Sequence, residues 1–346
     1  MNSEVDLQHH YNILTSSDDT LFIQIAVSLT DIAKTLSKDD IDFYLMHSQI
    51  SPEHIEILSA LCTGYGNIRF HEVKISDPEI FDPLVEAGGW FRETYYPLLA
   101  HQLLPETVER ILYLDAGDTL VVGDIAPYYM ADFQDNFLLV TGLEYKEERG
   151  IFIPLSKYDA EKEEFLQMIV TGLFNSGSYM INAKKMREAN IDISYYYQIT
   201  ERLNKRGIKL GIGINNFRNN FYFANDPDKT VIYKGDQGLL SAAFIGQITY
   251  FGYPQIRDRV YMPYNFAVGY YRYIDHEPDF EPAILHFVGG PYKPWKGNYP
   301  VFPQRFARSG DTLRELSELA PGQIRYYFLW LEYLFLTDQV LGLLGY

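Results

Sequence analysis

The first 141 residues alternate short apolar runs with helical patterns, and this alternation is the strongest constraint on the fold. Strands are predicted over residues 11–15, 42–46, 68–73, 110–114 and 137–141. After the first run, a polar turn precedes a helix whose apolar face includes Phe22, Ile25, Ala26 and Leu29. Strands that alternate with helices pair in parallel, in a sheet covered on both faces. The sequence therefore predicts an α/β fold with a mostly parallel central sheet flanked by helices.

Two further helices and one surface segment follow from local patterns. Ser51 can cap a helix that has Pro52 at its first position. A second helix is predicted over residues 94–104, directly before the strand at residues 110–114. Residues 144–164 are rich in charge and are expected to form a surface excursion that ends in a helix.

The C-terminal segment, residues 324–346, is apolar almost all round and differs from the rest of the chain. It is interrupted only by Arg325, Glu332 and Asp338. Its length approaches that of a membrane span, but acidic residues are costly in hydrocarbon and no basic cluster flanks the segment. A helix packed on the domain or at a homodimer interface is favoured over peripheral membrane contact. We therefore divide the chain into a domain at residues 1–305 and a C-terminal helical appendage at residues 306–346.

The formal net charge of −17 limits the partners of this chain. Such a charge argues against nucleic acid and against general attraction to anionic lipid. An acidic protein still binds a nucleotide where a metal ion and placed lysines reverse the local field. The first twelve residues lack the basic and apolar regions of a signal peptide, and the single cysteine, Cys62, forms no internal disulfide. The expected location is the cytoplasm, with membrane association at the cytoplasmic face as an alternative.

The segment RILYLDAGDTLVVGDI joins an apolar strand to two carboxylates, Asp115 and Asp118. Ligands in open α/β sheets bind at the carboxyl ends of strands, where carboxylates can hold a hard divalent cation. Carboxylates two residues apart point to the same side of an extended chain, whereas the spacing here is three. Gly117 can absorb the extra residue with a positive φ, so that the two side chains converge. The alternative is an acidic turn without a metal.

Five segments follow one another along the chain: NILTSSDD, RILYLDAGDTLVVGDI, FNSGSYMINAKKMRE, DQGLLSAAF and ILHFVGGPYKPW. In this order they resemble glycosyltransferase family 8, the retaining group that includes glycogenin and bacterial lipooligosaccharide galactosyltransferases. The resemblance runs from about residue 11 to residue 295. It implies a GT-A-type nucleotide-sugar-binding fold and a UDP-sugar as the donor substrate.

The resemblance also assigns a metal site and a nucleotide site. It implies that Asp115, Asp118 and His286 hold Mn2+ or Mg2+, a mixed carboxylate and imidazole set that suits such a metal. The alternative for His286, a lone histidine in the strand-like ILHF segment, is that it is a core residue that binds no metal. The residues implied to bind the nucleotide and its diphosphate are Ser16, Asp18, Thr20, Ala116, Gly289 and Lys293. For Asp18, helix capping is an alternative that needs no ligand.

Three further residues are implied to act on the donor sugar or acceptor. Asn175 lies in the FNSG turn, Asp236 would bind donor-sugar hydroxyls, and Gln237 would lie near the reactive face. For Asp236 and Gln237, the alternative is that they are polar residues that form a turn. Because an amide is only weakly nucleophilic, we expect attack on the same face as the departing phosphate rather than a double displacement.

The sequence departs from the family pattern at four places. The acidic motif and the interval from His286 to Lys293 are each one residue longer than usual. Gly238 stands where the family has a second aspartate, and Pro97 stands where it has an arginine. These departures keep open an alternative, a nucleotide-sugar-binding protein with weak or no transfer activity.

The predicted function is metal-dependent, retaining transfer of glucose or galactose from a UDP-sugar to a hydroxyl. The expected acceptors are glycans, lipid-linked acceptors or proteins, in cell-surface glycan or glycoprotein synthesis. Acceptor contacts are expected from the variable loops at residues 144–171 and 215–228. A metal-dependent nucleotidyltransferase is a further alternative, since similar sheets serve that chemistry.

Overall fold

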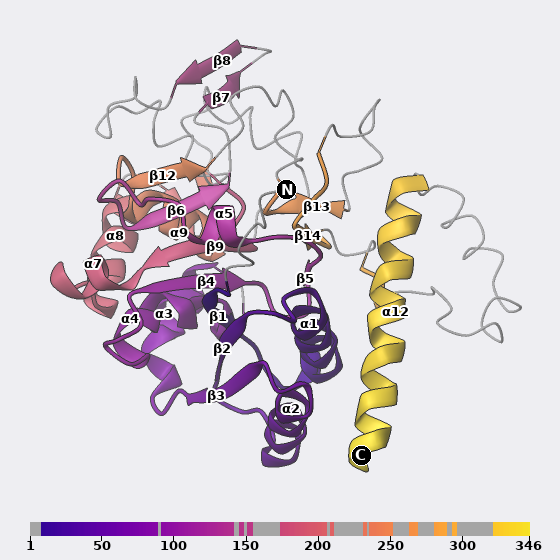
Figure 1. Cartoon of the computed structure of the whole chain (residues 1–346). Coiled ribbons are helices and arrows are strands. Elements are labelled where there is room, and N and C mark those ends of the chain that lie inside the picture. The colour runs from indigo at the N-terminus through magenta and orange to yellow at the C-terminus, as the bar shows by residue number, and fades with distance from the viewer. Residues whose placement is uncertain are drawn as a thin grey trace, which may run out of the picture.

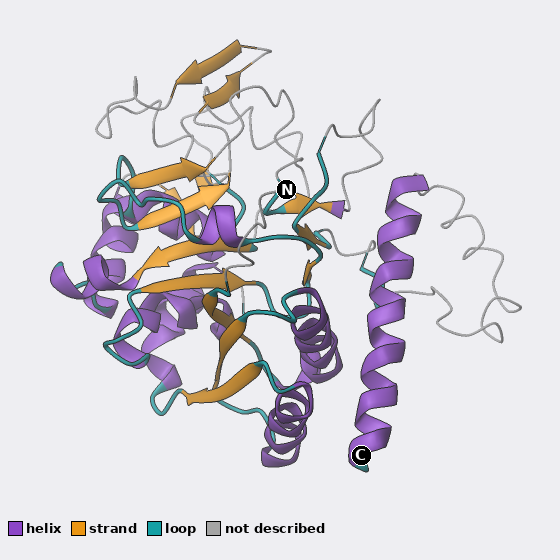
Figure 2. Cartoon of the chain, in the orientation of Figure 1, coloured by secondary structure: helices purple, strands orange, loops and turns teal. Residues whose placement is uncertain are grey.

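The computed structural model describes residues 8–88, 91–141, 145–148, 151–154, 174–205, 208–210, 231–233, 235–251, 263–268, 280–288, 293–295 and 321–346. Within these residues, a twisted central sheet lies between layers of helices (Figure 1). A long C-terminal helix stands beside the domain, as the colouring by element type makes clear (Figure 2).

The central sheet has seven strands in the order β12-β6-β9-β4-β1-β2-β3. Their bounds are β1 (His10–Ser16), β2 (Asp40–His47), β3 (Ile68–Lys74), β4 (Arg110–Leu114), β6 (Leu138–Thr141), β9 (Ser178–Asn182) and β12 (Ile248–Phe251). Neighbouring strands are parallel, except that β9 runs antiparallel to both β4 and β6. The prediction of a mostly parallel sheet is confirmed.

Both faces of the sheet are buried, because side chains alternate between two hydrophobic cores. On β1, Ile13 packs into one core and Leu14 into the other. The Ile13 face is covered by α1 (Phe22–Thr35) and α2 (Pro52–Tyr65). The Leu14 face is covered mainly by η3 (Arg92–Leu99), with α8 (Ile193–Lys205), α9 (Gly235–Ala243) and, at its margin, α3 (Asp82–Gly88). Each such side chain contributes roughly 1.5–3 kcal/mol when fully buried.

Local signals explain the ends of α2. The Ser51 hydroxyl accepts a hydrogen bond from the His54 N–H at 3.3 Å, and Pro52 occupies the first turn. Gly66 ends the helix with a φ of 84°, the left-handed conformation that glycine adopts without strain. Other short helices among the described residues are η1 (Asp19–Leu21), η2 (Pro78–Phe81), α5 (Ala126–Tyr129) and α7 (Ala183–Glu188).

The helix predicted over residues 94–104 is not a regular α-helix. The structure has instead a 3₁₀ helix, η3 (Arg92–Leu99), followed by one α-helical turn, α4 (Ala100–Leu103). Pro97 lies inside η3. Because proline has no N–H to donate and its ring clashes with the carbonyl four residues earlier, it disfavours α-helical hydrogen bonding at this point.

Three smaller sheets complete the described strands. One contains β5 (Thr119–Val121), β13 (Phe266–Ala267) and β14 (Ile284–His286), in the order β13-β14-β5. The others are the pairs β7 (Tyr145–Glu148) with β8 (Ile151–Pro154), and β10 (Ile208–Leu210) with β11 (Val231–Tyr233). The β7–β8 hairpin belongs to the expected surface excursion at residues 144–164. The predicted helical end of this excursion lies outside the described residues. The second expected acceptor loop, residues 215–228, also lies outside them.

The C-terminal helix α12 (Pro321–Leu344) packs along α1 and α2. Its inner face buries Trp330, and Thr337 donates to the Thr30 hydroxyl at 2.7 Å. Phe328 and Phe335 are exposed on its outer face. Among the described residues, no helix is long and apolar enough to cross a membrane. The domain boundary at residue 305 falls outside the described residues and stays a prediction.

Candidate active site

The turn between β4 and β5 brings Asp115 and Asp118 to the carboxyl edge of the sheet. Gly117 has a φ of 65° in this turn. A Cβ at Gly117 would also lie 2.2 Å from the Gln24 Cβ, so backbone conformation and space both require glycine. The Asp118 N–H and the Thr119 hydroxyl donate to the Asp115 carbonyl at 3.3 and 3.0 Å. The predicted positive φ at Gly117 is confirmed.

His286 reaches the same turn through the small sheet. Strand β14 pairs antiparallel with β5, which puts His286 opposite Thr119, and the Phe287 N–H donates to the Asp118 carbonyl at 2.8 Å. The imidazole packs directly on Gly177, where a Cβ would lie 2.0 Å from the ring. The Gly177 carbonyl accepts from the Asp115 N–H at 3.0 Å, so Gly177 lies between the two elements.

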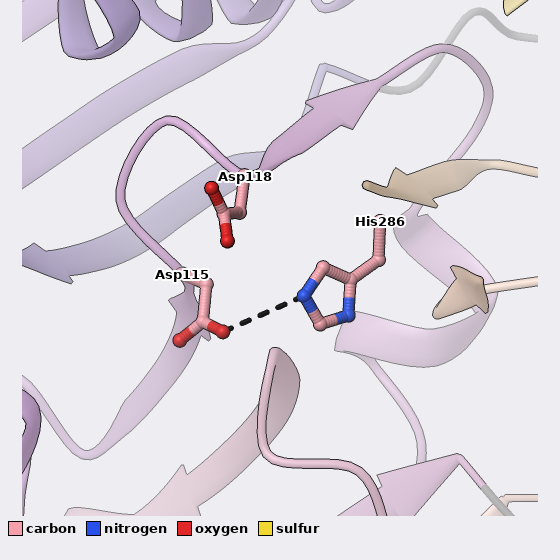
Figure 3. A group of neighbouring side chains, drawn as sticks. All are labelled: Asp115, Asp118 and His286. Atoms are coloured by element: carbon pink, nitrogen blue, oxygen red, sulfur yellow. Dashed lines mark ion pairs between the residues drawn. The ribbon is translucent and has the colours of Figure 1, made fainter. Parts of the chain in front are cut away.

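Asp115, Asp118 and His286 therefore converge, as the sequence predicts (Figure 3). One ligand atom from each lies within 4.8 Å of the others, and His286 Nε2 lies 3.5 Å from Asp115 Oδ2. Two carboxylates and one imidazole form a donor set that suits a divalent transition metal such as manganese. The chemistry and spacing of this group fit the cation that the sequence implies.

Lys293 supplies a positive charge beside this group. Its ammonium forms an ion pair with the Asp118 carboxylate, and the two side chains are only 15% and 17% exposed. Burial raises the pKa of Asp118, and Lys293 opposes that shift. Without a metal, Lys293 is thus the cation that compensates the Asp118 charge. A metal ion at this site would compete with it.

Asp236 and Gln237 lie in the first turn of α9, beside the turn that contains Gly177. The Gln237 side-chain oxygen accepts from the Ser176 N–H at 3.2 Å. The Asp236 side chain keeps some accessible surface, but closely packed protein atoms desolvate it. This desolvation, together with the negative charge of Asp115, raises the pKa of Asp236 to about 7. The repulsion from Asp115 ties Asp236 electrostatically to the acidic turn.

Ser16, Asp18 and Thr20, which are implied to bind the nucleotide, lie at or directly after the carboxyl end of β1. Strand β1 is the parallel neighbour of β4, so Ser16 at the end of β1 is close to the acidic turn. Asp18 accepts from the Thr20 N–H at 2.9 Å and thereby caps η1, which is the capping role that the sequence left open. Ala116 lies half-buried in the acidic turn, whereas Gly289 is outside the described residues.

The structure adds Asn265, a residue that the sequence motifs do not contain. Asn265 Oδ1 lies 2.9 Å from His286 Nδ1. Its amide nitrogen donates to the carbonyl and side-chain oxygens of Asn175, at 3.0 and 3.1 Å. Asn265 is one polar residue in the apolar run MPYNFAV, which gives no local signal of this role.

The overall fold matches solved glycosyltransferase structures. The galactosyltransferase LgtC, in complex with donor and acceptor sugar analogues, is similar with a TM-score of 0.55 at 22% identity, over 91% of this chain and 99% of that chain. The glycosyltransferase GlyE of Streptococcus pneumoniae TIGR4 has a TM-score of 0.55 at 17% identity, over 96% and 63% of the two chains. The architecture thus defines a GT-A-type fold.

The sequence places the chain more narrowly. Residues 12–298 match the family described as "Glycosyl transferase family 8", and the chain belongs to this family. The lipopolysaccharide 1,2-glucosyltransferase of Escherichia coli is 24% identical over 196 residues, which are 56% of this chain and 53% of that protein. The chain spans about half the length of the curated relatives it matches. The family predicted from the five motifs is confirmed.

Proposed function

We propose that this protein transfers a hexose, glucose or galactose, from a UDP-sugar to a hydroxyl group, with retention of anomeric configuration. The observation that carries the proposal is the convergence of Asp115, Asp118 and His286 at the carboxyl edge of a GT-A-type sheet. Family membership and the two relatives, a glucosyltransferase and a galactosyltransferase, support a hexose as the transferred group. Synthesis of a cell-surface glycan or glycoprotein is the process that such a reaction fits.

Asp115, Asp118 and His286 would hold a manganese or magnesium ion. When bound, this cation would neutralise charge on the diphosphate of the leaving UDP. Lys293, which forms an ion pair with Asp118, would add a second positive charge near the same phosphates. Asp236 would accept hydrogen bonds from the donor-sugar hydroxyls in its ionised form.

We explain retention of the anomeric configuration by attack of the acceptor hydroxyl on the same face of the sugar from which the phosphate departs. Gln237 lies next to Asp236 and its side chain is held by the Ser176 N–H. An amide is a weak nucleophile, so we assign Gln237 to the stabilisation of positive charge on the sugar, which gains oxocarbenium character as the bond breaks. Asn175, exposed in the adjacent turn, would contact the sugar or the acceptor.

One observation favours the alternative of a nucleotide-sugar-binding protein with weak or no transfer. Lys293 forms an ion pair with one carboxylate oxygen of Asp118, so the lysine competes with a metal ion for this ligand. Family membership does not support the nucleotidyltransferase alternative. A cytoplasmic location, homodimerisation and membrane contact through α12 stay predictions.

The test is UDP release from a panel of UDP-sugars, with and without manganese, by wild type and Asp118→Ala. The matched control is Asp338→Ala, which removes an exposed acid on α12. We expect metal-dependent turnover of one donor, lowered roughly 100-fold or more by Asp118→Ala and unchanged by Asp338→Ala. Donor binding without turnover would support the alternative instead.

A further inference from the structure

His286 belongs to a network of hydrogen bonds outside the acidic turn, whose members are Asn265 and Asn175. His286 and Asn265 are only 4% and 5% exposed, and His286 Nδ1 lies 2.9 Å from Asn265 Oδ1. Asn265 directly precedes β13, which runs parallel to β14 and pairs Ala267 with His286. The backbone of the small sheet therefore holds the asparagine beside the imidazole.

The donor and acceptor of each hydrogen bond in this network follow from Asn175, whose two oxygens can only accept. The Asn175 carbonyl can only accept, and Asn175 Oδ1 already accepts from the Gly177 N–H at 3.0 Å. Both oxygens face the side-chain nitrogen of Asn265, so the oxygen of the Asn265 amide must face His286. An amide oxygen accepts, so His286 Nδ1 must carry the hydrogen.

This arrangement selects the tautomer that a metal ligand needs. A neutral imidazole with its hydrogen on Nδ1 has a free lone pair on Nε2. His286 Nε2 is the nitrogen that faces Asp115. The ring lies directly against the Gly177 backbone, in space that a Cβ would occupy. Contact with Gly177 and the hydrogen bond from Nδ1 thus determine the plane and direction of the ring.

We propose that Asn265 is a positioning residue for the metal site: it holds His286 with the hydrogen on Nδ1 and directs Nε2 toward Asp115 and Asp118. The proposal rests on the metal site in the proposed function. Because Asn265 also donates to both oxygens of Asn175, it joins the metal-binding histidine to the turn assigned to the sugar. Partners of this kind set the affinity of a histidine for its metal.

The experiment compares wild type, Asn265→Leu and Asn265→Asp. Leucine has a similar volume and no acceptor, whereas aspartate keeps an acceptor for the Nδ1 hydrogen. Manganese affinity is measured without donor, from the electron paramagnetic resonance signal of the free ion. We expect Asn265→Leu to weaken binding about 10–100-fold. Asn265→Asp should weaken it less than Asn265→Leu, because aspartate keeps the acceptor for Nδ1 although it no longer donates to Asn175. Equal binding by Asn265→Leu and wild type would overturn the proposal.

A second readout needs neither metal nor activity. Nitrogen-15 NMR of the metal-free protein identifies which imidazole nitrogen carries the hydrogen, and His286→Gln assigns the signal. We expect wild type and Asn265→Asp to carry it on Nδ1, and Asn265→Leu to populate the Nε2 form. A wild-type signal from the Nε2 form would overturn the positioning role. This test needs only the wild-type protein, so it holds even where Asn265→Leu does not fold.

Failure of the proposed function gives a different pattern. A wild-type protein that binds no manganese contradicts the metal-dependent function, together with the metal-positioning role. Manganese binding by wild type with equal binding by Asn265→Leu contradicts the role of Asn265 alone. The tautomer of His286 then shows whether the hydrogen-bond chain is present without affecting the metal.

Discussion

Strand β5 has a carboxyl group at each end, and the two have opposite environments. Asp118, directly before the strand, forms an ion pair with Lys293 and lies near a second carboxylate and an imidazole. At the other end, Asp31 of α1 is fully buried and accepts a hydrogen bond from the Val121 N–H. Burial raises the pKa of both groups, and for Asp31 the bond from Val121 opposes the shift.

The two carboxyl groups differ in the role that we assign to them: Asp118 belongs to the proposed metal site, whereas Asp31 supports the fold. A buried carboxylate that retains its charge needs a cation, whereas one without a cation becomes neutral. Asp118 forms an ion pair with Lys293 and belongs to the group of side chains that could hold a metal ion. Asp31 accepts from the backbone of β5 and from the side chains of Tyr333 and Thr35, and its hydrogen bond to Val121 joins α1 to β5. The comparison predicts that changes at the two ends affect different properties.

The largest expected effect is that of Lys293→Met. Removing the ammonium leaves Asp118 without its cation, so a metal ion no longer competes with the lysine. We expect manganese binding without donor to become tighter. We also expect UDP release to fall about 10–100-fold, because the diphosphate loses a positive charge. Parallel metal titration and turnover assays measure the two effects, and weaker metal binding would contradict this account of the ion pair.

A smaller effect is expected from Gly117→Ala, which disturbs the turn before β5. A methyl group forces a positive φ on a residue that disfavours it and contacts the Gln24 Cβ. We expect a loss of about 1–3 kcal/mol in the free energy of unfolding, measured by urea denaturation. Gly246→Ala, at another glycine with positive φ but open space around it, is the control for backbone strain alone. Equal losses would show that the contact with Gln24 contributes nothing.

The smallest expected effect concerns Asp31, at the other end of β5, and the pH dependence of the free energy of unfolding. Because the folded pKa of Asp31 lies above the ordinary 3.8, the folded state binds more protons than the unfolded state between these two pKa values. Its contribution to stability is therefore complete at low pH and is lost as pH rises through the folded pKa. An asparagine side chain at this position would be neutral throughout, so Asp31→Asn should gain stability relative to wild type as pH rises from about 4 toward neutral.

Denaturation of both proteins across this pH range measures that difference. Other titrating groups contribute equally to wild type and variant, so the difference isolates Asp31. Turnover at pH 7 should stay within a few-fold of wild type, since Asp31 is not part of the metal group. A pH-independent difference would show that Asp31 has an ordinary pKa in the folded protein.

Local patterns in the sequence predicted much of the sheet and the metal group. Short apolar runs between helical patterns located β1 to β4, and Ser51 with Pro52 gave the start of α2. The spacing around Gly117 predicted its positive φ. These features depend on residues close in sequence, which is why they can be predicted without the structure.

Other features depend on contacts between distant segments. The pairing of β14 with β5 joins His286 to the acidic turn, and only the family resemblance suggested it. The antiparallel direction of β9 also has no local signal. Asn265 shows the same limit, because its role comes from an imidazole and an amide on other elements. Pro97 was visible in the sequence, but the predicted helix ignored its effect on α-helical hydrogen bonds.

The central claim is that the lengthened turn from Asp115 to Asp118 still holds a metal together with His286. Anomalous diffraction from crystals grown with manganese and UDP tests it most directly. The account predicts one anomalous peak in coordination contact with a carboxylate oxygen of each aspartate and with His286 Nε2. No peak at this position, or a peak that contacts neither aspartate, would contradict the claim.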